Sequence, residues 1–219
     1  RMGGERSLRV EENLGEGYVR LRVAEAERRQ AKHDIRCIED VVIEMLRNSR
    51  DAGAKHIYVA TSREGDLRTL VILDDGSGIP EDMQSRVFEA RVTSKLESVH
   101  MDRWGVHGRG MALYSVKENS LSAEVVSSGV GKGSSIRVTT SATALSERTD
   151  QSTWPSTTVD EKGQLICERG PHNIIRTCCE FAIEERAVCE VYIGSPAEIA
   201  ATARVKAAKT VGASNLMFQ

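Results

Sequence analysis

The chain has 219 residues and a formal net charge of −2, and 40% of its residues are hydrophobic, which is typical of a soluble protein with one core, or with one core and a small appendage. The charge gives no indication of a non-specific nucleic-acid binder, so DNA is not indicated as a partner, although the 30 Lys and Arg residues leave room for local basic patches. No apolar run approaches the ~18–20 residues that span a bilayer, so we expect no membrane partner.

The N-terminus and the cysteines indicate the compartment. No apolar stretch follows the polar first residues, so we expect no signal peptide. The five cysteines form no Cys-x-x-Cys spacing, and an odd set without a pattern favours free thiols in a reducing compartment. We therefore expect a cytoplasmic protein.

The N-terminal quarter predicts an arm, a strand and a long helix. Residues 1–16 are polar and contain glycine, which is typical of a flexible arm. Residues 18–23 alternate between apolar and polar side chains and predict a strand. Residues 24–52 contain neither Pro nor Gly and predict a single helix that ends at Gly53.

The rest of the chain alternates between hairpins and helices. Up to residue 140 the patterns predict a hairpin at 56–60 and 67–73, a short helix at 80–90, a loop at 91–109, a helix at 111–118 and a hairpin at 121–127 and 134–139. After a Ser- and Thr-rich linker at 141–158, they predict strands near Leu165 and at 188–193, with helices at 171–185 and 196–206. This order indicates an α+β fold: a two-layer α/β sandwich with a mixed, mainly antiparallel sheet and helices on one face.

Three polar residues share one side of the predicted long helix. Glu44, Asn48 and Asp51 are spaced by four and three residues, which places them in one stripe at the margin of the apolar face. An Asn amide oxygen suits Mg²⁺, and a Glu one turn earlier could take a proton from an attacking water. The alternative is a solvated stripe in which Arg47 and Arg50 make helical ion pairs.

Three glycine loops could approach a ligand closely. Asp74 ends a buried strand before Gly76 and Gly78, and its carboxylate could accept a hydrogen bond from an exocyclic amine such as that of adenine. The run 105–110 opens a helix and exposes backbone N–H groups, which favours phosphate. The run 131–134 leads into a strand. Each loop alone is an ordinary turn.

Taken in order, these pieces resemble the GHKL ATPase superfamily, which includes DNA gyrase-type topoisomerases, heat-shock-90 chaperones, sensor histidine kinases and MutL-type mismatch-repair proteins. Residues 44–54 look like the asparagine box of that family and residues 74–78 like its first glycine box. Residues 105–110 look like the second glycine box, and residues 131–134 are similar to the third, with Ser134 in place of the usual Thr. The resemblance covers about residues 30–140.

The resemblance implies a Bergerat fold, with ATP between the helices and the sheet under a lid at about 88–108. It implies an ATP-binding domain at 17–140 and leaves 159–219 as a C-terminal extension of unknown role. Glu44 would be the general base, Asn48 the Mg²⁺ ligand and Asp74 the adenine contact. The implied nucleotide-binding set is Asn48, Asp51, Asp74, Gly76, Gly78, Lys95, Gly105, Gly108, Arg109, Gly110 and Ser134.

The branch within the superfamily stays open. Residues 93–95 look like the mismatch-repair and type IIB topoisomerase branches, but we identify no Gln-x-Lys loop of the kind that supplies their transducer lysine. The run 33–36 looks like the phosphoacceptor box of a histidine kinase, although His33 is predicted on the same helix as Asn48.

Two functions follow as expectations, and a third reading competes with both. The first is a Mg²⁺-dependent ATPase or ATP-driven conformational switch that binds ATP or ADP and works with an unknown protein partner or as a homodimer. The second is a non-hydrolysing regulatory module or protein kinase-like domain that acts on a partner protein. The third is an α+β protein without a nucleotide site.

Overall fold

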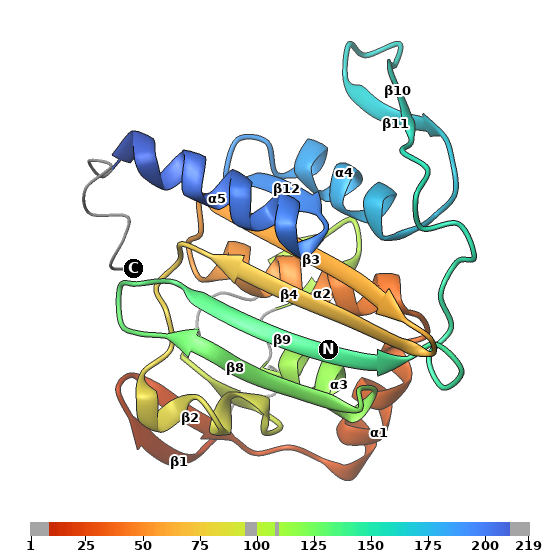
Figure 1. Cartoon of the computed structure of the whole chain (residues 1–219). Coiled ribbons are helices and arrows are strands. Elements are labelled where there is room, and N and C mark those ends of the chain that lie inside the picture. The colour runs from red at the N-terminus through yellow and green to blue at the C-terminus, as the bar shows by residue number, and fades with distance from the viewer. Residues whose placement is uncertain (1–8, 95–99, 108–109, 211–219) are drawn as a thin grey trace.

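The computed structural model describes residues 9–94, 100–107 and 110–210 (Figure 1). Its centre is a five-stranded sheet in the order β12-β3-β4-β9-β8. The strands are β3 (His56–Glu64), β4 (Leu67–Asp74), β8 (Ser122–Ser128), β9 (Ser134–Ser141) and β12 (Glu190–Gly194). Neighbours pair antiparallel except β12 and β3, which pair parallel, so the expected mixed and mainly antiparallel sheet is confirmed.

Four helices form a layer on one face of this sheet: α1 (Glu25–Asp34), α2 (Ile38–Asp51), α3 (Ala112–Glu118) and α4 (Ile174–Glu184). The core lies between this layer and the sheet, because strand alternation turns residues such as Leu70, Ile72, Ile136 and Val138 toward the helices. This arrangement is the expected α/β sandwich.

A fifth helix, α5 (Pro196–Thr210), lies on the opposite face, in front of β3 and β12 (Figure 1). Its Ile199 packs with Tyr58 and Ala60 of β3 in a second, smaller apolar cluster. The expectation of helices on one face therefore holds for α1–α4, whereas α5 covers side chains that alternate to the other side of β3.

The single long helix expected at 24–52 is wrong, because the chain forms two helices. α1 ends at Asp34, and Cys37 precedes α2 in an extended conformation. Cys37 forms a parallel bridge with Ser146, and the Ile38 amide donates to the Ser146 carbonyl at 2.9 Å. His33 and Asn48 are thus on different helices.

The N-terminal arm expected at 1–16 is wrong for its described second half. β1 (Val10–Gly15) pairs antiparallel with β2 (Tyr18–Leu21), and β2 pairs with β5 (Val92–Thr93), which gives a three-stranded sheet. The strand expected at 18–23 is confirmed in β2.

The segment around the expected lid is also more structured than the sequence indicates. Two 3₁₀ helices, η1 (Glu81–Met83) and η2 (Arg86–Phe88), replace the helix expected at 80–90. The loop expected at 91–109 contains β5 and a hairpin of β6 (His100–Asp102) and β7 (Gly105–His107). Such short elements are made by pairing partners rather than by a local periodicity.

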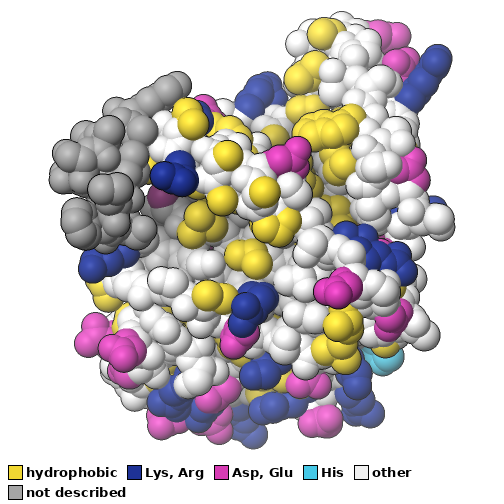
Figure 2. Space-filling model, in the orientation of Figure 1, with side chains coloured by type: hydrophobic (Ala, Val, Ile, Leu, Met, Phe, Trp, Pro, Cys, Tyr) yellow, Lys and Arg dark blue, Asp and Glu magenta, His cyan; other side chains and the backbone are white. Residues whose placement is uncertain are grey.

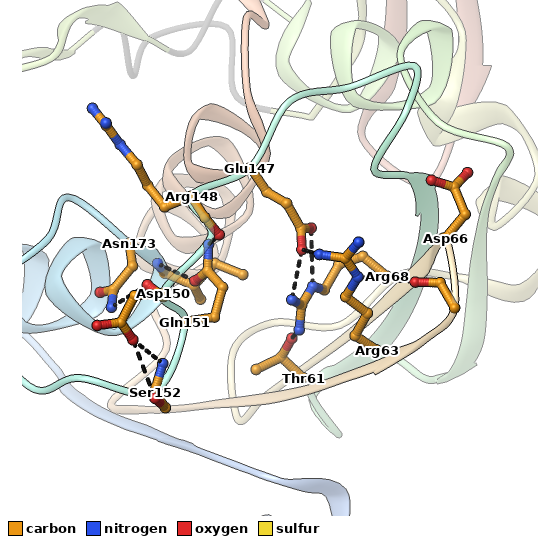
Figure 3. A network of polar contacts seen from close by, with 12 residues as sticks. Thr61, Arg63, Asp66, Arg68, Glu147, Arg148, Asp150, Gln151, Ser152 and Asn173 are labelled. Atoms are coloured by element: carbon orange, nitrogen blue, oxygen red, sulfur yellow. Dashed lines mark hydrogen bonds and ion pairs between the residues drawn. The ribbon is translucent and has the colours of Figure 1, made fainter.

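The segment 141–158, expected as a linker, is bonded to the body of the protein (Figure 3). Glu147 accepts hydrogen bonds from Arg68 and Arg63 at 2.7–3.1 Å. Further along, the Asn173 side chain at the start of α4 donates to the carbonyls of Asp150 and Thr153 at 3.1 and 3.0 Å. The segment leads into a hairpin of β10 (Ser156–Val159) and β11 (Leu165–Arg169), which projects from the body (Figure 1).

Candidate functional site

The asparagine-box residues are positioned by α2, which is anchored by its apolar face. Ile38, Val41, Val42, Met45 and Leu46 are fully buried against the sheet. The helix ends at Asp51 and is capped by Ala52. Gly53 follows with a φ of +77°, and its amide donates to the Arg50 carbonyl. This glycine stop is the expected one.

A pocket with about 740 Å³ of empty space, part of it open to solvent, lies between α2, the glycine loops and β5. Its polar side is lined by Asn48, Asp51 and Ser134 and by the loop residues 77–78. Its apolar lining is Tyr18, Ala52, Ile79, Val87, Val92, Ala112 and Leu113. An apolar cleft with a few convergent polar groups is the usual form of a small-molecule site.

The structure brings five of the predicted residues to this pocket: Asn48, Asp51, Gly78, Gly110 and Ser134. Gly76 belongs to the same loop as Gly78, and Gly105 begins β7 in the lid segment. Lys95, Gly108 and Arg109 lie outside the described residues.

Asp74 ends β4 and is 5% exposed. It does not itself line the pocket, but it is bonded to Ser134, which does. Its Oδ2 accepts hydrogen bonds from the hydroxyls of Ser49 and Ser134, both at 2.8 Å, and its Oδ1 accepts one from the Gly76 amide at 2.9 Å. A carboxylate has about four acceptor positions, so three bonds fix its orientation and leave capacity for one more donor.

The two glycine loops that contain Gly78 and Gly133 are in backbone contact beside the pocket. Gly78 has a φ of +74°, and a Cβ there would lie 1.9 Å from the Gly129 carbonyl oxygen. Gly133 has the same φ, and its Cβ would lie 1.9 Å from the Asp74 carbonyl oxygen. Only glycine fits these two places, because the backbones of the two loops touch.

The ends of the lid segment are tied together beside the pocket. The Arg91 amide donates to the Gly110 carbonyl at 2.7 Å, and both residues have a positive φ, of 62° and 69°. Thr93 and Ser94 follow on β5 and its exit, and both line the pocket. The segment between Arg91 and Gly110, which contains most of the expected lid at 88–108, thus begins and ends beside the pocket.

Glu44 does not line the pocket in this conformation. Arg47 Nη1 donates to Glu44 Oε1 at 2.9 Å, and Arg50 Nε donates to Asp51 Oδ1 at 2.9 Å. These are the helical ion pairs of the alternative reading, but they are buried rather than solvated: the Arg47 side chain is 3% exposed.

Both arginines also donate hydrogen bonds to Asp102 in the hairpin of β6 and β7, which we call the lid hairpin. Arg50 also donates to Glu185, which follows α4. Burial alone would lower the pKa of Arg50, but its hydrogen bonds with Asp102 and Glu185 raise the pKa above its ordinary value. The arginine therefore stays charged.

Sequence reasoning missed several residues of the site. Ser49, on the buried side of α2 and 1% exposed, could have been found as a polar residue in an apolar stripe. Tyr18 comes from the N-terminal hairpin; burial raises its pKa, while a hydrogen bond with Ser94 acts in the opposite direction. Asp102 and Glu185, which lie in a charge cluster outside the pocket lining, carry no sequence signal, because only the fold brings them to α2.

The described residues contain no cluster of three or more His, Cys, Asp and Glu side chains that could hold a metal ion. Mg²⁺ commonly takes one or two protein oxygens, several waters and the phosphates of its substrate. The Asn48 amide on the pocket wall fits that mode of binding, whereas the Asp51 carboxylate is 2% exposed and already accepts a hydrogen bond from Arg50.

Residues 35–167 match the sequence model of a family described as "Histidine kinase-, DNA gyrase B-, and HSP90-like ATPase". The DNA mismatch repair protein MutL of Thermus thermophilus is 38% identical over 81 residues, which are 37% of this chain and 14% of that protein. MutL of Listeria monocytogenes is 37% identical over 99 residues, which are 44% of this chain and 16% of that protein. The matched segments thus span about a sixth of these relatives or less.

A solved structure of full-length ShkA in complex with AMPPNP overlaps 74% of this chain and 33% of its own length, at 17% identity and a TM-score of 0.33.

Proposed function

Because the chain belongs to the histidine kinase-, DNA gyrase B- and HSP90-like ATPase family, we propose that its pocket binds ATP with Mg²⁺ and that it works as an ATPase or an ATP-driven conformational switch. The observation that carries this proposal is the buried Asp74 carboxylate, oriented by three hydrogen bonds, one of them from Ser134 on the pocket lining.

The apolar lining of the pocket suits a purine. Ile79, Val87, Val92 and Leu113 offer apolar surface for a flat ring, and glycine at position 78 lets backbone approach it. The remaining acceptor capacity of Asp74 matches an exocyclic amine. We propose Asp74, Gly76, Gly78 and Ser134 as the adenine end of the site.

The polar lining of the pocket suits phosphates and a divalent cation. Asn48 would hold Mg²⁺ through its amide oxygen, with Asp51 beside it on the pocket wall. When bound, Mg²⁺ would offset negative charge on the phosphates. Gly110 and the lid residues Lys95, Gly105, Gly108 and Arg109 are proposed for the phosphate end, where backbone N–H groups and cations favour an anion.

For hydrolysis we propose Glu44 as the general base. A water oxygen would bond to the γ-phosphorus, the bond to the bridging oxygen would break, and the proton of the water would pass to Glu44, which gives ADP and inorganic phosphate. General bases of this kind contribute about 10²–10⁴ to a rate. Steady-state phosphate release should therefore fall by at least about a hundredfold in Glu44→Ala, while binding of ATP is retained.

A non-hydrolysing nucleotide switch is the second candidate. It is favoured by the ion pair of Glu44 with Arg47 and by the absence of Glu44 from the pocket lining. Phosphate release separates the two: binding of an ATP analogue without phosphate release from the wild type would reject hydrolysis and retain the switch.

The metal is tested separately. Affinity for a non-hydrolysable ATP analogue, measured by calorimetry with and without Mg²⁺, should rise with Mg²⁺ in the wild type. In Asn48→Ala the Mg²⁺-dependent gain should be lost. The same gain in both proteins would contradict the assignment of Asn48.

Partners and compartment are proposed on narrower grounds. We propose a protein partner or a second copy of the chain; a rise of specific ATPase activity with protein concentration would indicate the homodimer. No helix in the described part of the chain is long and apolar enough to cross a membrane. All five cysteines are unpaired, and we propose a cytoplasmic location on this ground.

A further inference from the structure

A buried charge cluster joins α2 to the lid hairpin and to the end of α4. Asp102 Oδ2 accepts hydrogen bonds from Arg47 Nε and Arg50 Nη1, both at 3.0 Å. Arg50 Nη1 also donates to Glu185 Oε1 at 2.6 Å. The side chains of Arg47, Arg50, Asp102 and Glu185 are 3–14% exposed, so these bonds are largely shielded from water.

Asp102 is held rigidly by its own hairpin. Its Oδ1 accepts a hydrogen bond from the Trp104 amide at 2.9 Å, which closes the turn between β6 and β7. The Trp104 ring stacks on Phe181 of α4, with 5.5 Å between ring centroids. The carboxylate therefore gives Arg47 a fixed partner.

Arg47 links Asp102 to Glu44 through two hydrogen bonds. One nitrogen of its planar guanidinium binds Asp102, and another, Nη1, binds Glu44 Oε1 at 2.9 Å. Because the guanidinium is planar and its N–H directions are fixed, an arginine pinned through Nε can offer Nη1 in one direction only. Asp102 thus orients the Glu44 carboxylate through Arg47.

We propose that Arg47 and Asp102 are positioning residues for Glu44: Asp102 orients Arg47, and Arg47 orients the general base. The inference rests on the proposed hydrolysis. A base aligned by a neighbouring group, which a third group aligns in turn, is a recurrent arrangement of catalytic sites. The competing explanation is that the cluster only fixes the lid hairpin to the helices.

Glu185 distinguishes these explanations, because it pairs with Arg50, which it shares with Asp102, and so belongs to the Arg50 arm of the cluster. Glu185→Gln weakens the Arg50 arm of the cluster alone. Asp102→Asn and Arg47→Met weaken the arm that leads to Glu44. These three variants of the full chain form a matched set.

The test is steady-state phosphate release, with analogue affinity measured in parallel by calorimetry. In Arg47→Met and Asp102→Asn we expect kcat to fall about tenfold or more, since small misplacements of a catalytic group are costly. KM and analogue affinity should stay within about twofold, and the double variant should be no slower than the slower single variant. Arg47→Lys should stay as slow as Arg47→Met, because a lysine ammonium lacks the planar fork that binds Asp102 and Glu44 together. Glu185→Gln should keep kcat within about twofold of the wild type.

A spectroscopic control tests the competing explanation directly. In a Trp154→Phe background the emission of Trp104 reports whether the hairpin stays on Phe181. We expect unchanged emission in Arg47→Met, because Arg50 and the ring contact still hold the hairpin. A red shift that accompanies the loss of kcat would overturn the positioning role.

The remaining outcomes are also decisive. If the wild type hydrolyses ATP and the Arg47 and Asp102 variants do so equally well, or if Glu185→Gln is equally impaired, the positioning role is rejected while the ATPase stands. If the wild type binds the analogue but releases no phosphate, hydrolysis and the positioning of a base are both rejected while nucleotide binding stands.

Discussion

At the scale of single residues, the central feature is a carboxylate with oriented donors. Asp74 is buried, and burial of a charge is costly unless it is hydrogen-bonded. Ser49 and Ser134 supply two of its hydrogen bonds from different elements, α2 and β9. The orientation of the Asp74 carboxylate therefore depends on how the helix layer packs against the sheet.

Removing one of these donors should weaken both stability and binding. Ser49→Ala should lower the free energy of unfolding by about 1–3 kcal/mol, because it leaves the buried Asp74 short of one donor. Chemical denaturation measures the first effect, and calorimetry with an ATP analogue should show weaker binding. Ser62→Ala, at an exposed position of β3, is the matched control and should change neither.

Two glycines with nearly equal φ values distinguish a steric clash of an added Cβ from the strain of the left-handed backbone. Gly78 and Gly131 have φ values of +74° and +71°, but a Cβ meets the Gly129 carbonyl at Gly78 and nothing within 4 Å at Gly131. Gly131→Ala should cost about 1–2 kcal/mol of stability from the left-handed backbone alone. Gly78→Ala should cost clearly more and abolish analogue binding; equal losses in the two denaturation curves would contradict the backbone contact between the two loops.

At the scale of elements, the sequence predicted what local patterns determine. Both hairpins of the central sheet and the end of α2 at Gly53 follow from alternation, turn residues and a glycine stop. The break between α1 and α2 does not, since residues 35–37 have no helix-breaking residue and the break is set by pairing with Ser146. The strands β5, β6 and β7 were missed for the same reason, because they too are set by their pairing partners.

The attachment of the segment 141–158 should depend on pH. Burial raises the pKa of Glu147. Its hydrogen bond with Arg68 and the charges of Arg68 and Arg63 lower the pKa by a larger amount, so the net pKa lies below the ordinary value. A lowered pKa in the folded state contributes stability that is present above the unfolded pKa of about 4.3 and is lost as pH falls through the folded value.

Glu147→Gln should therefore lower the free energy of unfolding by about 3 kcal/mol at pH 7, as expected for a broken buried ion pair. The difference from the wild type should shrink as the pH falls below about 4. Glu124→Gln, which breaks the exposed pair with Arg137, is the control and should cost about 0–1 kcal/mol. A difference that is independent of pH would contradict the role of the Glu147 charge.

At the scale of the whole molecule, the order of four weak motifs predicted one site. Asn48, Asp51, Gly78, Gly110 and Ser134 are far apart in sequence and meet at one pocket. The location of Glu44 outside the pocket lining was not predictable, because it depends on Arg47 and on a lid residue that the fold brings to α2. The sequence thus indicates the pocket, and the structure adds the charge cluster beside it.

Nucleotide binding through Asp74 is the central claim, and calorimetric titration of the full chain with a non-hydrolysable ATP analogue and Mg²⁺ tests it most directly. We expect the wild type and Asp75→Asn to bind, since Asp75 Oδ1 instead accepts hydrogen bonds from the amides of Lys55 and His56. Asp74→Asn should lose binding by a factor of about ten or more, because its amide replaces one acceptor oxygen with a donor. Equal binding by wild type and Asp74→Asn, or no binding by the wild type, would contradict the account.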